Sequence, residues 1–199
     1  NIKDIHRKPY DFSYGKKILF ALPNITYISS RLMPLQPINR IKQNTSMIKG
    51  LNNNVLKDLM IRSHPNHTQK SYVKDIAGTC EISSEKDFWA DLINSRLFIT
   101  TNNSTTFLQS MISNCPSILI LLDQQKEVRD ISMSSYSLLE QENIVFTDIE
   151  LAIKHINSIA DDPQVWWKSS SVKKARKNFC EQHSRRTKEP IYELSKLFF

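Results

Sequence analysis

Short apolar runs recur along the chain and predict strands. Such runs are too brief for membrane-spanning helices and are typical of strands buried on both faces of a parallel sheet. We therefore expect about five strands, covering residues 16–23, 56–62, 96–101, 117–122 and 144–147.

Apolar positions at helical spacing occur between these runs and after the last one. Ser84 is the expected N-cap of one helix, facing Asp87, and Thr147 opens a capping box with Glu150 in another. The final helix combines an apolar stripe with basic residues on the opposite side. The expected helices cover residues 39–53, 84–94, 107–113, 147–160 and 166–183.

The alternation of strands and helices predicts an α/β fold: a Rossmann-like open parallel sheet of about five strands flanked by helices, with a C-terminal basic helix. The main domain is expected to span residues 1–165, and the basic helix and tail residues 166–199. With 40% apolar and 24% charged residues, the composition is that of a globular protein and excludes a disordered one.

The net charge of +7 is confined to one segment. Between residues 166 and 188, eight Lys and Arg residues stand against Glu181 alone, so the rest of the chain is neutral. This segment is either a solvated helix face or a surface for an anionic partner such as a membrane, a nucleotide or a charged glycan. Nucleic acid is not expected, because no aromatic residues are interleaved with the charges.

Cysteine usage indicates free thiols in a reducing compartment. Cys80, Cys115 and Cys180 are an odd number and lack CxxC spacing. No signal peptide pattern opens the chain, which starts at Asn1 and is interpreted as a fragment or a processed piece. We expect a cytoplasmic protein, peripheral at the inner membrane if the basic segment binds lipid.

Three loops that follow predicted strands carry the candidate chemistry, because ligands of open α/β sheets bind beyond the carboxyl ends of strands. The chain lacks GxGxxG and P-loop motifs. The loop after residue 101 instead places Ser104, Thr105 and Thr106 at a helix start, where hydroxyl and backbone N–H groups favour an anion. Simple helix capping is the alternative reading.

The loop after residue 62 contains His64 and Pro65. Proline keeps the preceding residue extended, so His64 either contacts a phosphate, ribose or base, or caps a loop carbonyl. His64 and His67 lack a third ligand nearby, and no metal is expected. No acidic pair suitable for catalysis is evident, so the catalytic residue is unknown.

Three segments carry a resemblance to a known family: LMIRSHP (59–65), DLINSRLFITTNNSTTFLQSMISNCP (91–116) and DDPQVWWKSSSVKKARKNF (161–179). Together they resemble the C-terminal, donor-binding half of GT-B-type bacterial glycosyltransferases, and are similar to surface-carbohydrate transferases and to 3-deoxy-manno-octulosonic acid (Kdo) transferases. Polyglycerol-phosphate polymerases share a similar strand–Ser/Thr–helix element.

The resemblance implies a nucleotide-sugar site, for a donor of the CMP-Kdo type, without a further cofactor. By the same likeness Gln36, before Pro37, matches a Gln-Pro element. Arg62 is expected to be an anion partner by its position and not by a motif match. The implied acceptor is a glycan or a lipid-linked molecule of the bacterial envelope. The implied donor-contacting residues are His64, Pro65, Ser104, Thr105, Thr106, Arg62 and Gln36.

The chain departs from the family in two respects. It has about half of the length that a two-domain enzyme needs, so the acceptor domain is not expected within it. Gln109 also stands where a glutamate often follows the Ser/Thr element. A phosphotransferase domain of the teichoic-acid type and a non-catalytic, truncated binding module therefore remain alternatives.

Overall fold

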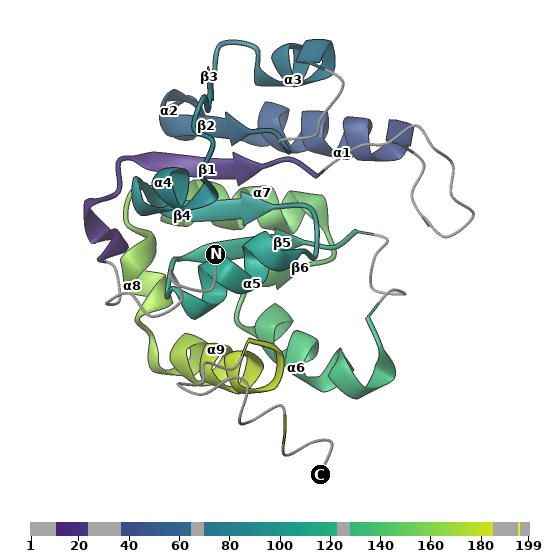
Figure 1. Cartoon of the computed structure of the whole chain (residues 1–199), viewed down its shortest axis with the longest axis vertical. Coiled ribbons are helices and arrows are strands. Elements are labelled where there is room, and N and C mark those ends of the chain that lie inside the picture. Colours follow the sequence, from purple (N-terminus) through teal and green to yellow (C-terminus); the bar gives the residue numbers. More distant parts are fainter. Residues whose placement is uncertain (1–10, 24–36, 65–69, 123–127, 185–194, 196–199) are drawn as a thin grey trace.

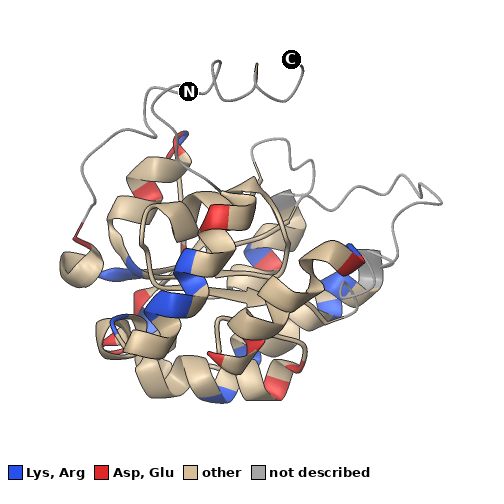
Figure 2. Ribbon diagram, turned by 90° about the horizontal axis from the view of Figure 1, so that it is seen from below, with Lys and Arg blue, Asp and Glu red and all other residues tan. Residues whose placement is uncertain are grey.

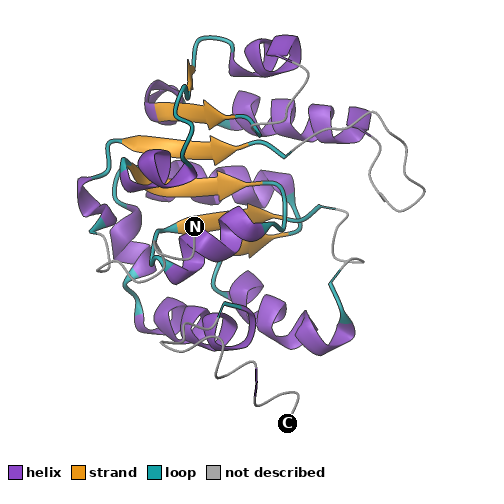
Figure 3. Cartoon of the chain, viewed as in Figure 1, coloured by secondary structure: helices purple, strands orange, loops and turns teal. Residues whose placement is uncertain are grey.

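The computed structural model describes residues 11–23, 37–64, 70–122, 128–184 and 195. It confirms the α/β prediction: one open sheet of six parallel strands lies between helices (Figures 1 and 3). The strand order is β3-β2-β1-β4-β5-β6, so β1 lies at the centre. The strands are β1 (Lys17–Ala21), β2 (Leu59–Arg62), β3 (Glu81–Ile82), β4 (Ser95–Thr100), β5 (Ser117–Ile120) and β6 (Val145–Phe146).

The helices lie on both faces of the sheet, with α1 and α7 on one face and α4 and α5 on the other (Figure 1). They are η2 (Phe12–Tyr14), α1 (Pro37–Gly50), α2 (Asn53–Asp58), α3 (Lys70–Ala77), α4 (Phe88–Ile93), α5 (Thr105–Ile112), α6 (Asp130–Gln141), α7 (Ile149–Ile159), α8 (Pro163–Trp167) and α9 (Ser170–His183).

Alternate residues of the central strands supply the two faces of the core. On β1, Ile18 and Phe20 pack in the cluster that α1, α3 and α7 cover. Leu19 and Ala21 belong to the cluster on the opposite face, which includes Leu92 of α4. Because both faces are buried, the strand reads as one continuous apolar run.

A second layer of helices extends the core beyond the sheet. Phe179 of α9 packs edge-on against Phe107 of α5, with ring centroids 5.9 Å apart, and against Tyr136 of α6, at 5.2 Å. The α6–α9 pair therefore continues the cluster that α5 and β5 begin. The predicted division of the chain at residue 165 stays a prediction.

Several predicted boundaries were wrong because local hydrogen bonds outweigh the apolar pattern. The strand predicted from residue 56 begins at Leu59, since Leu56 donates to the Asn52 carbonyl within the turn that α2 forms. The helix predicted from Ser84 begins at Phe88, where the Asp87 carboxylate accepts from the Trp89 N–H.

The ends of the last three helices also differ from expectation. Asp148, not Thr147, caps α7 by accepting from the Leu151 N–H at 3.0 Å. The single helix predicted for residues 166–183 is divided into α8 and α9, because Pro163 starts a short separate helix that ends at Trp167.

The sheet has one strand more than predicted. β3 consists of two exposed residues at the sheet edge, so no apolar run marks it. α3 and α6 were also absent from the prediction. As predicted, Cys80, Cys115 and Cys180 are thiols and not halves of disulfides. Burial raises the pKa of the Cys115 thiol well above its usual value.

Candidate functional site

A pocket of about 430 Å³ lies where β1, β2 and β4 end. The described residues that follow these strands, among them Pro23, His64 and Ser104, meet there, as the parallel topology predicted. This is the crevice between β1 and β4, where the connections leave toward opposite faces of the sheet. Its lining includes Pro23, Arg62, His64, Ser104, Thr105 and Thr106.

The start of α5 forms one wall of the pocket. The N-cap Ser104 makes no side-chain cap hydrogen bond, and its hydroxyl instead lies 2.8 Å from that of Thr106. Ser104 accepts through its carbonyl from the Phe107 N–H, so the amides of Thr105 and Thr106 are the first-turn donors left for a ligand. The helix dipole favours an anion at this position.

Hydrogen bonds hold the loop between β4 and α5. The Thr100 hydroxyl donates to the Ala21 carbonyl at 3.3 Å and accepts from the Asn102 N–H at 3.2 Å. The neighbouring Thr101 hydroxyl donates to the Asn44 amide oxygen of α1 at 2.9 Å. Asn103 in turn accepts from the Tyr136 hydroxyl of α6 at 2.9 Å. The loop is thus positioned before a ligand arrives.

Arg62 lines the pocket, but its guanidinium is engaged in the protein. It forms a buried ion pair with Asp91 and donates to the carbonyls of Glu85 and Lys86 at 2.9 and 3.0 Å. Ser83 also donates to the Asp91 carboxylate, at 2.6 Å. Arg62 therefore joins β2 to the segment before α4, a role that its sequence position did not reveal.

Lys86 is the basic residue of the pocket that sequence reasoning missed. It is exposed, and it lines the pocket beside Phe88, which lies at the start of α4. The predicted helix start at Ser84 placed Lys86 inside a helix, so no signal linked it to the strand ends. The hydrogen bond from the Arg62 guanidinium to the Lys86 carbonyl helps to position Lys86 at the pocket.

The pocket is suited to an anion. Lys86 and His64 line it together with the paired Arg62, and no carboxylate does so among the described residues. Gln36 and Pro65, also predicted to contact the ligand, lie outside the described residues. Within those residues, no group of three or more His, Cys, Asp or Glu side chains could hold a metal ion.

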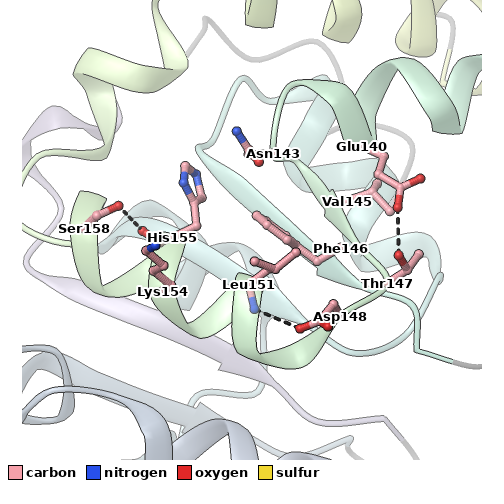
Figure 4. A pocket seen from close by; sticks show the side chains of 10 residues that line it. All are labelled: Glu140, Asn143, Val145, Phe146, Thr147, Asp148, Leu151, Lys154, His155 and Ser158. Carbon is pink, nitrogen blue, oxygen red and sulfur yellow. Dashed lines mark hydrogen bonds between the residues drawn. The ribbon is translucent and has the colours of Figure 1, made fainter.

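Two other hollows lie away from the strand ends. One, of about 350 Å³, lies between β6 and α7 (Figure 4). Its acidic groups serve the fold, because Asp148 caps α7 and Glu140 accepts from Thr147 at 2.8 Å. The other, of about 580 Å³, includes the ion pair between Lys17 and Glu81 and lies nearer the starts of the strands. Neither contains a predicted ligand-contacting residue.

Comparison with known protein families identifies the family of this chain. The sequence model described as "LIC12162 family transferase" matches residues 3–198. The chain belongs to this transferase family. No curated protein and no solved structure matches it.

Membership of the LIC12162 family makes the carboxyl-end pocket a candidate transferase site. Transferases need a place that stabilises the group leaving the donor, and the start of α5 offers backbone and hydroxyl donors for one. No described helix of this family member is both long and apolar enough to cross a membrane.

Proposed function

We propose that this LIC12162 family transferase binds a nucleotide sugar in the pocket at the ends of β1, β2 and β4, as the donor-binding domain of a glycosyltransferase. The observation that carries the proposal is the convergence of His64, Lys86 and the open start of α5 on one pocket without carboxylates among its described lining. The sequence resemblance to GT-B enzymes supports the same assignment, including a donor of the CMP-Kdo type and a role in bacterial surface polysaccharide synthesis.

The proposed chemistry is electrostatic stabilisation of the leaving nucleotide. A phosphate at the start of α5 accepts from the N–H groups of Thr105 and Thr106 and from the Thr105 hydroxyl. Lys86 adds positive charge, and the His64 ring adds a hydrogen bond. As the bond to the sugar breaks, negative charge grows on this phosphate, and fixed donors stabilise it without reorganisation.

We place the acceptor site and the catalytic base outside this pocket. None of its described lining residues is a carboxylate that could deprotonate an acceptor hydroxyl. We propose that a glycan or a lipid-linked acceptor approaches from the open side of the strand ends. The division of labour matches a donor-binding half rather than a self-contained active site.

Binding of nucleotide sugars to the purified chain tests the proposal. We expect CMP-, UDP- or GDP-linked sugars to raise the unfolding temperature, since a ligand at about 100 times its Kd stabilises by about 2.7 kcal/mol. Thr105→Ala should then weaken binding by about 10- to 100-fold in calorimetry, because a hydrogen bond to a charged group contributes about 1.5–3 kcal/mol.

Thr79→Ala provides the matched control, because Thr79 is also an exposed threonine but lies in the turn before β3. Its affinity should equal that of the parent protein. Equal affinities for Thr105→Ala and the parent would reject the phosphate site at α5. Binding of free nucleotides with no preference for their sugar-linked forms would argue against a sugar donor and favour the phosphotransferase alternative.

A further inference from the structure

Three lysines gather on the outer face of α9. Lys173, Lys174 and Lys177 lie within two turns and are all exposed. Lys177 forms an ion pair with Glu181 at 3.9 Å, and a pair this exposed contributes little. Figure 2 views the molecule from the end that α9 forms and shows basic positions along this helix.

The inner face of α9 packs against the core. Val172, Ala175 and Phe179 are buried. Arg176 lies over the Trp167 ring, with its guanidinium carbon 4.1 Å from the ring centroid, and donates to the Asn114 side chain. Because these contacts hold the helix in one rotation, the three lysines stay directed toward the solvent.

Exposed apolar side chains lie on the neighbouring helix α6. Ile131 is 85% exposed and Leu138 is 38% exposed, and their spacing of seven residues places them on one flank of the helix. α6 packs against α9, where Ser135 and His183 are hydrogen-bonded at 2.7 Å. The two helices, which carry the exposed lysines and the exposed apolar groups, lie together at one end of the molecule (Figure 1).

We infer that the α6–α9 end docks on the surface of an anionic lipid bilayer. Clustered lysines attract acidic headgroups, and exposed Ile and Leu side chains enter the interfacial layer beside them. A single-stranded nucleic acid would instead need exposed aromatic rings. The two tryptophans at the start of this region do not offer them, since Trp167 is buried and the Trp166 indole donates to the Glu142 carbonyl at 3.0 Å.

The inference does not depend on the proposed nucleotide-sugar site. The lysines lie on α9, whereas the pocket lies at the ends of β1, β2 and β4.

Vesicle flotation of the full chain tests the inference. The probes are phosphatidylcholine vesicles with and without about 30 mol % phosphatidylglycerol, at about 0.05 M and about 0.5 M salt. We expect binding to the anionic vesicles at low salt and its loss at high salt. The combined K173Q, K174Q and K177Q variant should bind about 100-fold more weakly, at about 1 kcal/mol per lysine. Ile131→Ser should weaken binding by about tenfold.

The matched control carries K49Q, K57Q and K74Q, which remove the same charge from exposed positions on α1, α2 and α3. It should bind as the parent protein does, and circular dichroism should show all variants folded. Equal loss in both triple variants would overturn the inference, as would the absence of binding at low salt. Tighter binding to a DNA duplex than to vesicles at equal salt would also overturn it.

Discussion

At the scale of single residues, the structure separates polar groups that hold the fold from those that face the pocket. Arg62 and Asp91 are 8% and 2% exposed and neutralise each other 29 positions apart in the chain. Removing either partner leaves a buried charge, which commonly costs about 3–5 kcal/mol. A loss of ligand binding in an Arg62 variant would therefore report unfolding as readily as a lost contact, and Thr105 is the better probe.

His155 is predicted to make stability depend on pH. Its ring lies between Phe146 and Trp166, with centroids 5.5 and 5.0 Å away, and its buried Nε2 lacks a hydrogen-bond partner among the described residues. Burial lowers the pKa of His155 below its ordinary value of 6.5. As the pH falls, the unfolded chain therefore protonates His155 at a higher pH than the folded protein does. The free energy of unfolding is fully maintained above about pH 6.5 and decreases as the pH falls below it.

Replacing His155 with Phe removes this titration while keeping an aromatic ring. We expect the unfolding free energy of the variant to fall less than that of the parent between about pH 7.5 and about pH 5.5, as measured by urea denaturation. His183, whose pKa burial also lowers, is present in both proteins and cancels in the comparison. Identical pH slopes would contradict the prediction.

At the scale of elements, one helix end joins three helices. Asn114 follows α5 in the left-handed conformation, with φ 67°. Its carbonyl and side-chain oxygens accept from the Trp167 indole of α8 at 3.0 and 3.2 Å, and its side chain also accepts from Arg176 of α9. Burial lowers the pKa of Arg176 to about 10, which reflects how closely this joint surrounds the guanidinium.

Substitutions of Asn114 should separate backbone strain from side-chain bonding. Asn114→Gly keeps the left-handed turn and the carbonyl that accepts from Trp167, but it loses the side-chain bonds to Trp167 and Arg176, with an expected cost of about 1–3 kcal/mol. Asn114→Ala adds about 1 kcal/mol of strain. Asn143 is the control: it has φ 58° but no side-chain hydrogen bond within the described residues. Asn143→Gly should be nearly neutral in denaturant unfolding, and an equal cost at both sites would refute the proposed joint.

At the scale of the whole molecule, the pocket loop is held from both faces of the sheet. Asn44 of α1 is fully buried, and its side-chain oxygen accepts a hydrogen bond from the Thr101 hydroxyl. The side-chain NH2 group of Asn44 donates to the Tyr72 hydroxyl of α3 at 3.0 Å. On the other face Tyr136 holds Asn103 and packs on Phe179. The candidate site is therefore tied to α1, α3, α6 and α9 together.

Thr101→Val should weaken this tie without changing side-chain shape. It leaves the buried Asn44 oxygen without its donor, so we expect a loss of about 1–3 kcal/mol in unfolding free energy. Thr45→Val is the matched control, because Thr45 donates to the Ile41 carbonyl within α1 and its loss leaves no such orphan group. If both variants lose the same stability, the tie between α1 and the pocket loop contributes nothing.

The pattern of apolar residues along the chain was sufficient to predict the fold class and to predict that the loops after the strands meet at one edge of the sheet. Central strands such as β1 are buried on both faces, so each must be continuously apolar and is visible in the sequence. Parallel connections then bring successive strand ends to one edge, which is why His64 and the Ser104–Thr106 segment could be expected to share a pocket.

Contacts between segments far apart in the chain decided the edge strand β3 and the partners of individual polar side chains. β3 has two exposed residues and pairs only through its backbone with β2, so no side-chain pattern announces it. Arg62 reads as a free strand-end cation until folding brings Asp91 to it, and it then also donates to the carbonyl of Lys86, which lines the pocket. The indoles of Trp166 and Trp167 likewise find their acceptors, the carbonyls of Glu142 and Asn114, only in the folded chain. Such partners are chosen by packing in three dimensions, which spacing along the chain does not encode.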